Sequence, residues 1–365
     1  MTAPGVGAAG APESADLSGV DSRRLASGAA IALVIISLVL PLVLSSYWVD
    51  TVTKWIPLAV AALGLNLLTG YNGQISVGHG AFYGVGAYTT ALLITNAHWP
   101  FVPALIVAAV LCFVTGVIVG LPALRIKGLY LALVTLAVAT LFPQIVEQFS
   151  SFTKGSTGLR LVTETVNRRG ATVEKDITFE APSWMHLSER QWTYYLLIAV
   201  ALLCFVIARN LVTSRVGRAM VAIRDNEIAA EVNGINVARI KVLTFGVSAA
   251  MAGVGGGLLA MATKSVGPAS FGVAASLYFL VAVVIGGPAS IVGPALGAVF
   301  YGAFNDVVGP ELPDSFRGAL PLVLGALLIG LMFVAPGGIV GWLRGMVAKR
   351  QGAAVAPAPL GSTST

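Results

Sequence analysis

Charged side chains are scarce in this sequence. Only 10% of the 365 residues are Asp, Glu, Lys or Arg, whereas 56% are hydrophobic and 42 are glycine. A soluble domain carries about 25% charged residues, because it must cover its surface with groups that water solvates. Contact with lipid removes that requirement, and glycine is tolerated in membrane helices. The composition therefore excludes a soluble enzyme and predicts an all-α, polytopic integral membrane protein.

The residues that usually carry catalysis and metal binding are also few. The three histidines, His79, His98 and His186, are far apart and show no metal-ligand spacing. Both cysteines, Cys112 and Cys204, lie in apolar runs, where we expect small packing residues rather than a disulfide. The chain has no Gly-x-x-x-x-Gly-Lys-Ser/Thr phosphate loop. We therefore expect no enzyme activity, no metal site and no cofactor bound by this chain.

The net charge of +6 does not predict a nucleic-acid partner. The basic residues are spread over short segments between apolar runs instead of forming one stripe. Loops on the cytoplasmic side of a membrane are commonly basic, and this bias accounts for the pattern.

About ten transmembrane helices are predicted, some of them broken by glycine. With the N-terminus in the cytoplasm, an even number of spans leaves both termini cytoplasmic, and the basic loops then fall on that side. The domains are a disordered cytoplasmic tail at 1–24, a transmembrane domain at 25–343 and a cytoplasmic tail at 344–365. The expected spans are 28–46, 51–69, 75–95, 101–122, 128–148, 192–209, 242–262, 276–290, 291–306 and 317–335.

The polar segment 149–191 interrupts this apolar background on the expected external side. Its charges nearly balance, and its alternating Val, Thr and Phe residues suggest a small hairpin or lid. Docking of an external protein and a passive surface loop are both open interpretations.

Two glycine-rich interruptions fall inside or beside expected spans, at 71–80 and 286–294. Irregular backbone at membrane depth must face protein or a water-filled cavity, since an unpaired amide in hydrocarbon costs several kcal/mol. The alternative is a turn at the membrane edge whose polar groups are wet. The candidates for lining a translocation path are Asn66, Asn72, Gln74, Ser76, His79 and Ser290.

The two interruptions resemble each other. Gly73-Gln-Ile-Ser-Val aligns with Gly287-Pro-Ala-Ser-Ile, which places Ser76 opposite Ser290. Broken segments at corresponding positions of two halves point to a transport site. An internal repeat is therefore a hypothesis.

The segment 210–241 is an expected cytoplasmic loop with helical periodicity. An amphipathic helix there can dock on a soluble partner or lie on the anionic leaflet, and the composition leaves both open. The residues expected to act in this loop are Arg215, Gly217, Arg218, Glu227, Ala229, Ala230 and Gly234.

This loop resembles the coupling loop of the permease subunits of ATP-driven importers, whose signature is Glu-Ala-Ala, three residues, then Gly. Ala229, Ala230 and Gly234 are in register, whereas position 228 is Ile and the acid, Glu227, lies one place earlier. The chain as a whole resembles the LivM-type permeases of branched-chain amino acid importers from about residue 55 to 340. The other segments that carry the resemblance are LNLLTGYNGQISVGHGAFYGVGAY (65–88), LRIKGLYLALVTLA (124–137) and IGGPASIVGPALGA (285–298).

The resemblance implies a permease subunit of a binding-protein-dependent importer for branched-chain amino acids in a bacterial plasma membrane. It implies four kinds of partner: a second homologous permease, two cytoplasmic ATPases that use the ATP, an external substrate-binding protein and the lipid bilayer. Urea, short amides or other amino acids remain alternative substrates. A secondary carrier that works without ATP is a further alternative; the coupling loop and the lack of a clear ionisable residue within the spans argue against it.

Overall fold

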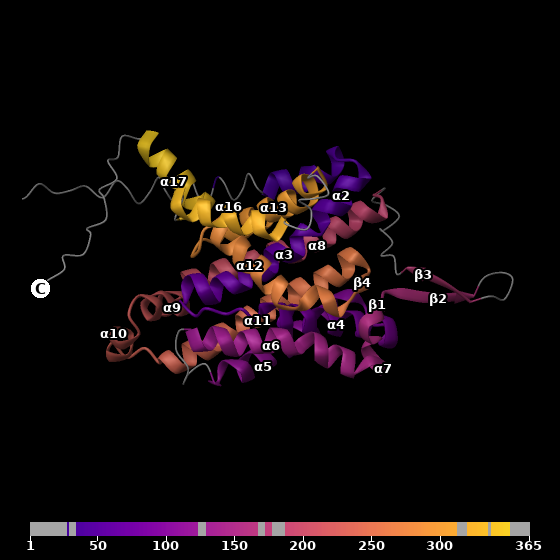
Figure 1. The fold of residues 1–365 in the computed structure, drawn as a ribbon, viewed down its shortest axis with the longest axis horizontal. Helices are drawn as coiled ribbons and strands as arrows, with labels where there is room; N and C mark the ends of the chain where they lie inside the picture. Colours follow the sequence, from indigo (N-terminus) through magenta and orange to yellow (C-terminus); the bar gives the residue numbers. More distant parts are fainter. Residues whose placement is uncertain are drawn as a thin grey trace, which may run out of the picture. The chain divides into compact units, whose positions relative to one another are not determined.

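The computed structural model describes residues 28, 34–122, 129–166, 172–176, 187–311, 320–334 and 337–350 (Figure 1). The chain divides into two units, residues 1–39 and 40–365. In the first unit the described residues are helical, and an apolar helix, Val34–Val43, begins there. The predicted disordered tail at 1–24 lies outside the described residues.

The second unit is built mainly of apolar helices. Among the described residues, five helical stretches are long and apolar enough to cross a membrane: Ser46–Tyr71, Phe101–Gly120, Tyr130–Gln148, Glu189–Thr213 and Val237–Thr263. The first combines α2 (Ser46–Thr53), α3 (Trp55–Asn66) and η1 (Leu67–Tyr71); the others are α5 (Phe101–Gly120), α6 (Leu129–Gln148), α8 (Glu189–Thr213) and α11 (Val237–Thr263). The described residues thus form an all-α, polytopic membrane protein.

The described part of the unit contains further helices. They are α4 (His79–Ala97), α7 (Ser150–Thr153), α9 (Arg215–Asp225), α10 (Glu227–Val232), α12 (Val273–Gly286), α13 (Gly293–Ala303), α14 (Gly309–Glu311), α16 (Leu320–Val334) and α17 (Gly338–Arg350), with single turns η3 (Gly155–Thr157), η4 (Pro268–Phe271) and η5 (Phe304–Val308).

Most predicted spans coincide with a helix, but some boundaries differ. Helices α8 and α11 extend past the expected ends of their spans, so the connection between them is 214–236 rather than 210–241. Helix α12 has 14 residues, which is short for a full crossing, and the 11 residues of α13 continue through η5 and α14 to Glu311. The number ten therefore stays a prediction. Residues 344–350, predicted as tail, belong to α17.

Glycine allows helix α11 to pack closely against α5. Gly253 and Gly257 of α11 face α5, while Gly116 and Gly120 of α5 face α11. The residues opposite these glycines include Cys112, Leu105, Ala249 and Phe245. Both cysteines are buried and free, which confirms that they are packing residues.

The polar segment after α6 contains a β-hairpin, as predicted. Strand β2 (Val162–Val166) pairs antiparallel with β3 (Thr172–Asp176), and Val162 lies opposite Asp176. A second short pair joins β1 (Leu159–Arg160) to β4 (Ser265–Val266). In Figure 1 the β2–β3 hairpin lies at one end of the helices of the second unit, and α9 and α10 lie at the other end.

The contact between α11 and α4 gives a first prediction. A Cβ added at Gly256 would overlap the carbonyl oxygen of Tyr83, which is backbone and cannot rotate away. We expect Gly256→Ala to destabilise the protein by about 1–3 kcal/mol, the usual cost of overpacking, and to lower its apparent melting temperature in detergent. The control is Gly345→Ala in α17, where a Cβ meets nothing within 4 Å. Equal melting temperatures for the two variants would contradict this packing.

Candidate functional site

The first glycine-rich interruption is a true break in the helices. Helix α3 continues as the π-helix η1, the chain leaves helical geometry at 72–78, and α4 begins at His79. Gly73 adopts φ +71°, a conformation that favours glycine. A Cβ there would lie 2.9 Å from Cγ of Arg224 on α9. Both the turn and the close approach of α9 therefore require glycine at this position.

Neighbouring helices satisfy the freed backbone of the break. The Val77 N–H donates to Thr135 Oγ1 on α6 at 3.0 Å, and the Gly80 N–H donates to Ser276 Oγ on α12 at 2.8 Å. The Gln74 N–H returns to the carbonyl of Leu68 at 3.1 Å. Each of these amides would otherwise be unpaired in a low-dielectric interior. Protein groups therefore pair these backbone amides of the break, although the Ile75 side chain is 48% exposed.

His79 is fully buried at the start of α4 and joins three segments. Its Nε2 lies 2.6 Å from Ser248 Oγ, and that hydroxyl lies 2.6 Å from the carbonyl oxygen of Gly64. A carbonyl only accepts, so Ser248 donates to Gly64 and accepts from the His79 Nε2–H. The Nδ1 then accepts from the hydroxyl of Ser76, 3.0 Å away. A neutral His79 thus connects the break to α11 and, through Ser248, to α3.

The side-chain amide of Asn66 connects the two glycine-rich interruptions. Its Nδ2 donates to the Ser290 carbonyl at 2.8 Å, and its Oδ1 accepts from the Ala289 N–H at 3.0 Å. Asn66 is 0% exposed, and Ala289 has φ 55°. Two segments more than 200 residues apart are therefore held together by one buried amide.

The second interruption connects α12 to α13, and these two helices pack differently from α3 and α4, which the first interruption connects. Gly287 has φ 112°, and the Ser290 hydroxyl accepts from the Gly293 N–H at 3.3 Å at the start of α13. Helices α12 and α13 pack closely, so that a Cβ at Gly297 would overlap the Ala282 carbonyl, whereas α3 and α4 barely touch. The internal repeat stays a prediction.

The six candidates for lining a path are brought close together but are buried. Their exposed fractions range from 0 to 6%. The amide atoms of Asn72 and the Oε1 of Gln74 have no hydrogen-bond partner in the described part of the chain. A role in a path stays a prediction for all six: Asn66, Asn72, Gln74, Ser76, His79 and Ser290.

The loop between α8 and α11 folds into two helices with defined caps. The Ser214 hydroxyl accepts from the N–H groups of Val216 and Gly217 at the start of α9, and the Asn226 side chain accepts from the Ala229 N–H in α10. A Cβ at Gly217 would overlap the carbonyl of Val212, so glycine is needed where α8 turns into α9.

The glycine of the coupling-loop signature ends α10. The Gly234 N–H donates to Glu231 O at 2.9 Å, and the Ile235 N–H donates to Ala230 O at 3.1 Å. These two bonds form a Schellman motif, which needs a left-handed residue, and Gly234 has φ +80°. A Cβ there meets nothing within 4 Å, so the requirement is conformational.

Two contacts connect this loop to the first break. The Arg224 Nη1 donates to the carbonyl of Gly70 at 3.0 Å. Glu227 pairs with Lys241 at 2.9 Å, and the backbone carbonyl of Lys241 accepts from the Gln74 side chain at 3.3 Å. The acid that lies one place early in the signature thus has a partner at the start of α11.

Other predicted loop residues face outward. Arg215, Arg218 and Ala229 are exposed, and so are the apolar side chains of Ile228 (74%) and Val232 (83%). Ala230 is buried. The sequence reasoning did not predict the other residues of this hydrogen-bond network. For Thr135, Ser248 and Ser276 the available signal was a polar side chain within an apolar run. The missed residues are Thr135, Arg224, Lys241, Ser248 and Ser276.

The Asn66 amide gives a second prediction. In Asn66→Asp the donor to the Ser290 carbonyl is lost, and two oxygens face each other in a buried place. We expect a loss of about 3 kcal/mol or more in the free energy of unfolding, because a buried acceptor loses its partner and a charge is buried. The measurement is unfolding of the detergent-purified chain. Asn96→Asp, at an exposed position, is the control and should be nearly neutral; equal losses would contradict the role of Asn66.

Comparison with known proteins places the chain in a family. The family described as the permease component of the branched-chain amino acid transport system matches residues 47–336. The Escherichia coli K12 protein LivM, a high-affinity branched-chain amino acid transport system permease protein, is 32% identical over 336 residues, covering 89% of this chain and 77% of LivM. Its Salmonella typhimurium counterpart is 32% identical over 331 residues, covering 88% and 77%.

A second kind of relative is LivH. The LivH permease protein of Salmonella typhimurium is 28% identical over 295 residues, covering 78% of this chain and 91% of LivH. No solved structure gives a significant match. The family match covers most of the chain and agrees with the apolar helical fold. This membrane protein therefore belongs to the family of permease components of branched-chain amino acid transport systems.

Proposed function

We propose that this chain is the transmembrane permease subunit of an ATP-driven importer for branched-chain amino acids. Its partners would be a second, homologous permease of the LivH kind, two cytoplasmic ATPases and an external substrate-binding protein. Both termini would lie in the cytoplasm of a bacterial cell. The names of the relatives, branched-chain amino acid permeases of two kinds, support the substrate and the second permease. The resemblance of the loop 214–236 to a coupling loop supports the ATPases and the binding protein.

The connection between the loop and the first break is the observation that carries this proposal. Helices α9 and α10 stand at one end of the second unit and are linked to the break by Arg224 and Lys241 (Figure 1). The exposed Ile228 and Val232 of α10 offer an apolar contact to a soluble protein. An ATPase that moves α10 would pull on Gly70 and Gln74. ATP hydrolysis would then shift the helices on either side of the break.

The rigid end of α10 is a place to test this coupling. Gly234→Val puts a β-branched residue at φ +80°, which costs at least about 1–2 kcal/mol and disrupts the Schellman motif. We expect ATP-dependent uptake to fall several-fold while ATPase activity continues, because the loop no longer transmits the movement. Uptake and ATP hydrolysis are measured together in proteoliposomes that contain the whole importer.

Gly345→Val in α17 is the control for the Gly234 variant, since its added side chain also meets nothing within 4 Å at Cβ and its φ is not left-handed. The amount of each variant in the membrane is measured by immunoblot. Unchanged uptake in Gly234→Val would remove the loop from the mechanism.

The assembly itself is tested by affinity purification of this chain from its native membrane. We expect a second permease and ATPase subunits to be recovered with it, identified by mass spectrometry. Recovery of the chain alone, with leucine uptake into liposomes in the absence of ATP, would overturn the importer and favour a secondary carrier.

A further inference from the structure

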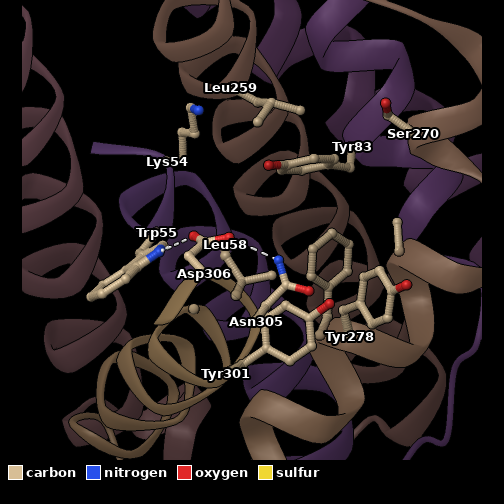
Figure 2. A pocket seen from close by; sticks show the side chains of 13 residues that line it. Lys54, Trp55, Leu58, Tyr83, Leu259, Ser270, Tyr278, Tyr301, Asn305 and Asp306 are labelled. Atoms are coloured by element: carbon tan, nitrogen blue, oxygen red, sulfur yellow. Dashed lines mark hydrogen bonds between the residues drawn. The ribbon is translucent and has the colours of Figure 1, made fainter. Parts of the chain in front are cut away.

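A cavity of about 260 Å³ lies away from the network described above. Helix α3 begins at its wall with Trp55 and ends at Asn66, next to the loop that binds α9, so the cavity is at the far end of α3 from α9. Figure 2 shows its lining side chains. They include Lys54, Trp55, Leu58, Tyr83, Leu259, Tyr278, Phe279, Tyr301, Asn305 and Asp306.

An acid with free acceptor capacity lies in this wall. Asp306 belongs to the π-helix η5, and its Oδ2 accepts from Trp55 Nε1 at 2.7 Å. Its Oδ1 accepts from Asn305 Nδ2 at 2.8 Å (Figure 2). A carboxylate has about four acceptor positions, so two remain for a ligand. The two bonds hold the carboxylate in place without neutralising it.

A base stands on another side of the same cavity. Lys54 has no ion-pair partner among the described residues. Figure 2 shows its ammonium on the side of Leu259. Lys54 also lines a polar groove of about 470 Å³ that contains Asp50, Glu189 and Arg190. The lysine is therefore shared by a polar groove and the cavity.

The remaining wall is apolar and aromatic. The rings of Tyr278 and Tyr301 lie 4.9 Å apart at 34°, and those of Tyr83 and Phe279 lie 5.0 Å apart. Leu58 and Leu259 add aliphatic surface. Aromatic faces attract an ammonium group and also pack against hydrocarbon.

We propose that this cavity binds a free α-amino acid with an apolar side chain. Asp306 receives the ammonium group, Lys54 pairs with the carboxylate, and the aromatic and aliphatic wall takes the side chain. The proposal rests on the proposed function, which it deepens by placing a substrate site in this chain. It also moves the expected ligand contacts away from the buried residues around Asn66.

The paired charges distinguish this ligand from others of the same size. An acyl chain gains nothing from a held carboxylate, and a simple cation would be repelled by Lys54. A zwitterion satisfies both groups at once. The volume is slightly below the usual range of ligand pockets, about 300–1,000 Å³, which suits a small amino acid.

The test is leucine binding to the purified full chain in lipid nanodiscs, measured by scintillation proximity with radiolabelled L-leucine. We expect Asp306→Asn to weaken binding about 10-fold or more, because a charge-assisted hydrogen bond to the ammonium is lost. Lys54→Met should weaken it similarly by removing the partner of the carboxylate. The matched controls are Glu311→Gln and Lys154→Met, exposed residues outside the cavity, which should bind as the wild type does.

Two leucine analogues show which functional group of leucine each residue binds. The first, 4-methylpentanoate, lacks the amine, and the second, 3-methylbutylamine, lacks the carboxylate. Wild-type protein should prefer leucine to both. Asp306→Asn should lose most of its preference over the first analogue, and Lys54→Met should lose most of its preference over the second.

Several results would overturn the cavity as a substrate site. The first is that wild-type protein binds no leucine below about 10 mM. The second is that it binds leucine and 4-methylpentanoate equally well. The third is that Asp306→Asn and Lys54→Met both bind leucine as the wild type does. Lys54 is exposed, so its variant keeps the test decisive if Asp306→Asn fails to fold. ATP-dependent uptake by the complete wild-type importer is measured in parallel. Normal uptake with unaffected variants refutes only the cavity, whereas no uptake by wild type refutes the proposed function.

Discussion

The buried amide of Asn66 and the backbone at Ala289 and Ser290 hold together the two places where the helices break. A broken helix in a membrane exposes N–H and C=O groups that lipid cannot satisfy. One break receives partners from α6 and α12 through Thr135 and Ser276, and the other receives them from Asn66. Each irregular segment is therefore stable only while its neighbours stay in place. This mutual dependence explains why so many buried polar side chains gather around the two breaks.

Much of the fold could be predicted from the sequence, because apolar length and helical periodicity are local properties. The helical spans and the hairpin after α6 follow from local pattern. Partners far apart in the chain do not. Nothing near Asn66 indicates that its amide will bind residues 289 and 290, and nothing local reveals that Ser248 lies between His79 and Gly64. The resemblance to a family identified the loop, but its connections through Arg224 and Lys241 depend on tertiary structure.

The departure from the coupling-loop signature has a physical explanation in the fold. Asn226 caps α10, so Glu227 becomes the first helical residue and is placed near the helix N-terminus, where a negative charge is favourable. From there it reaches Lys241, whose side chain is only 12% exposed. An acid at position 228 would instead stand where Ile228 is 74% exposed. Moving the acid by one residue therefore exchanges a surface charge for a contact with α11 and leaves an apolar side chain on the outer face of α10.

Helices α3 and α13 connect the two ends of the second unit. At one end Asn66 binds the residues before α13; at the other Trp55 binds Asp306, just after it. The twelve residues from Trp55 to Asn66 are separated by eleven rises, about 16 Å of helix. Gly302 allows α13 to lie against the Trp55 ring. Because α3 and α13 are joined at both ends, they move together as one body more easily than they slide past each other. A displacement that Arg224 imposes on Gly70 would then reach the wall that contains Asp306 without a chain of separate rearrangements. The π-helix η1 follows Asn66, and the π-helix η5 contains Asp306. The irregular turns therefore lie at the two contacts that join α3 to α13.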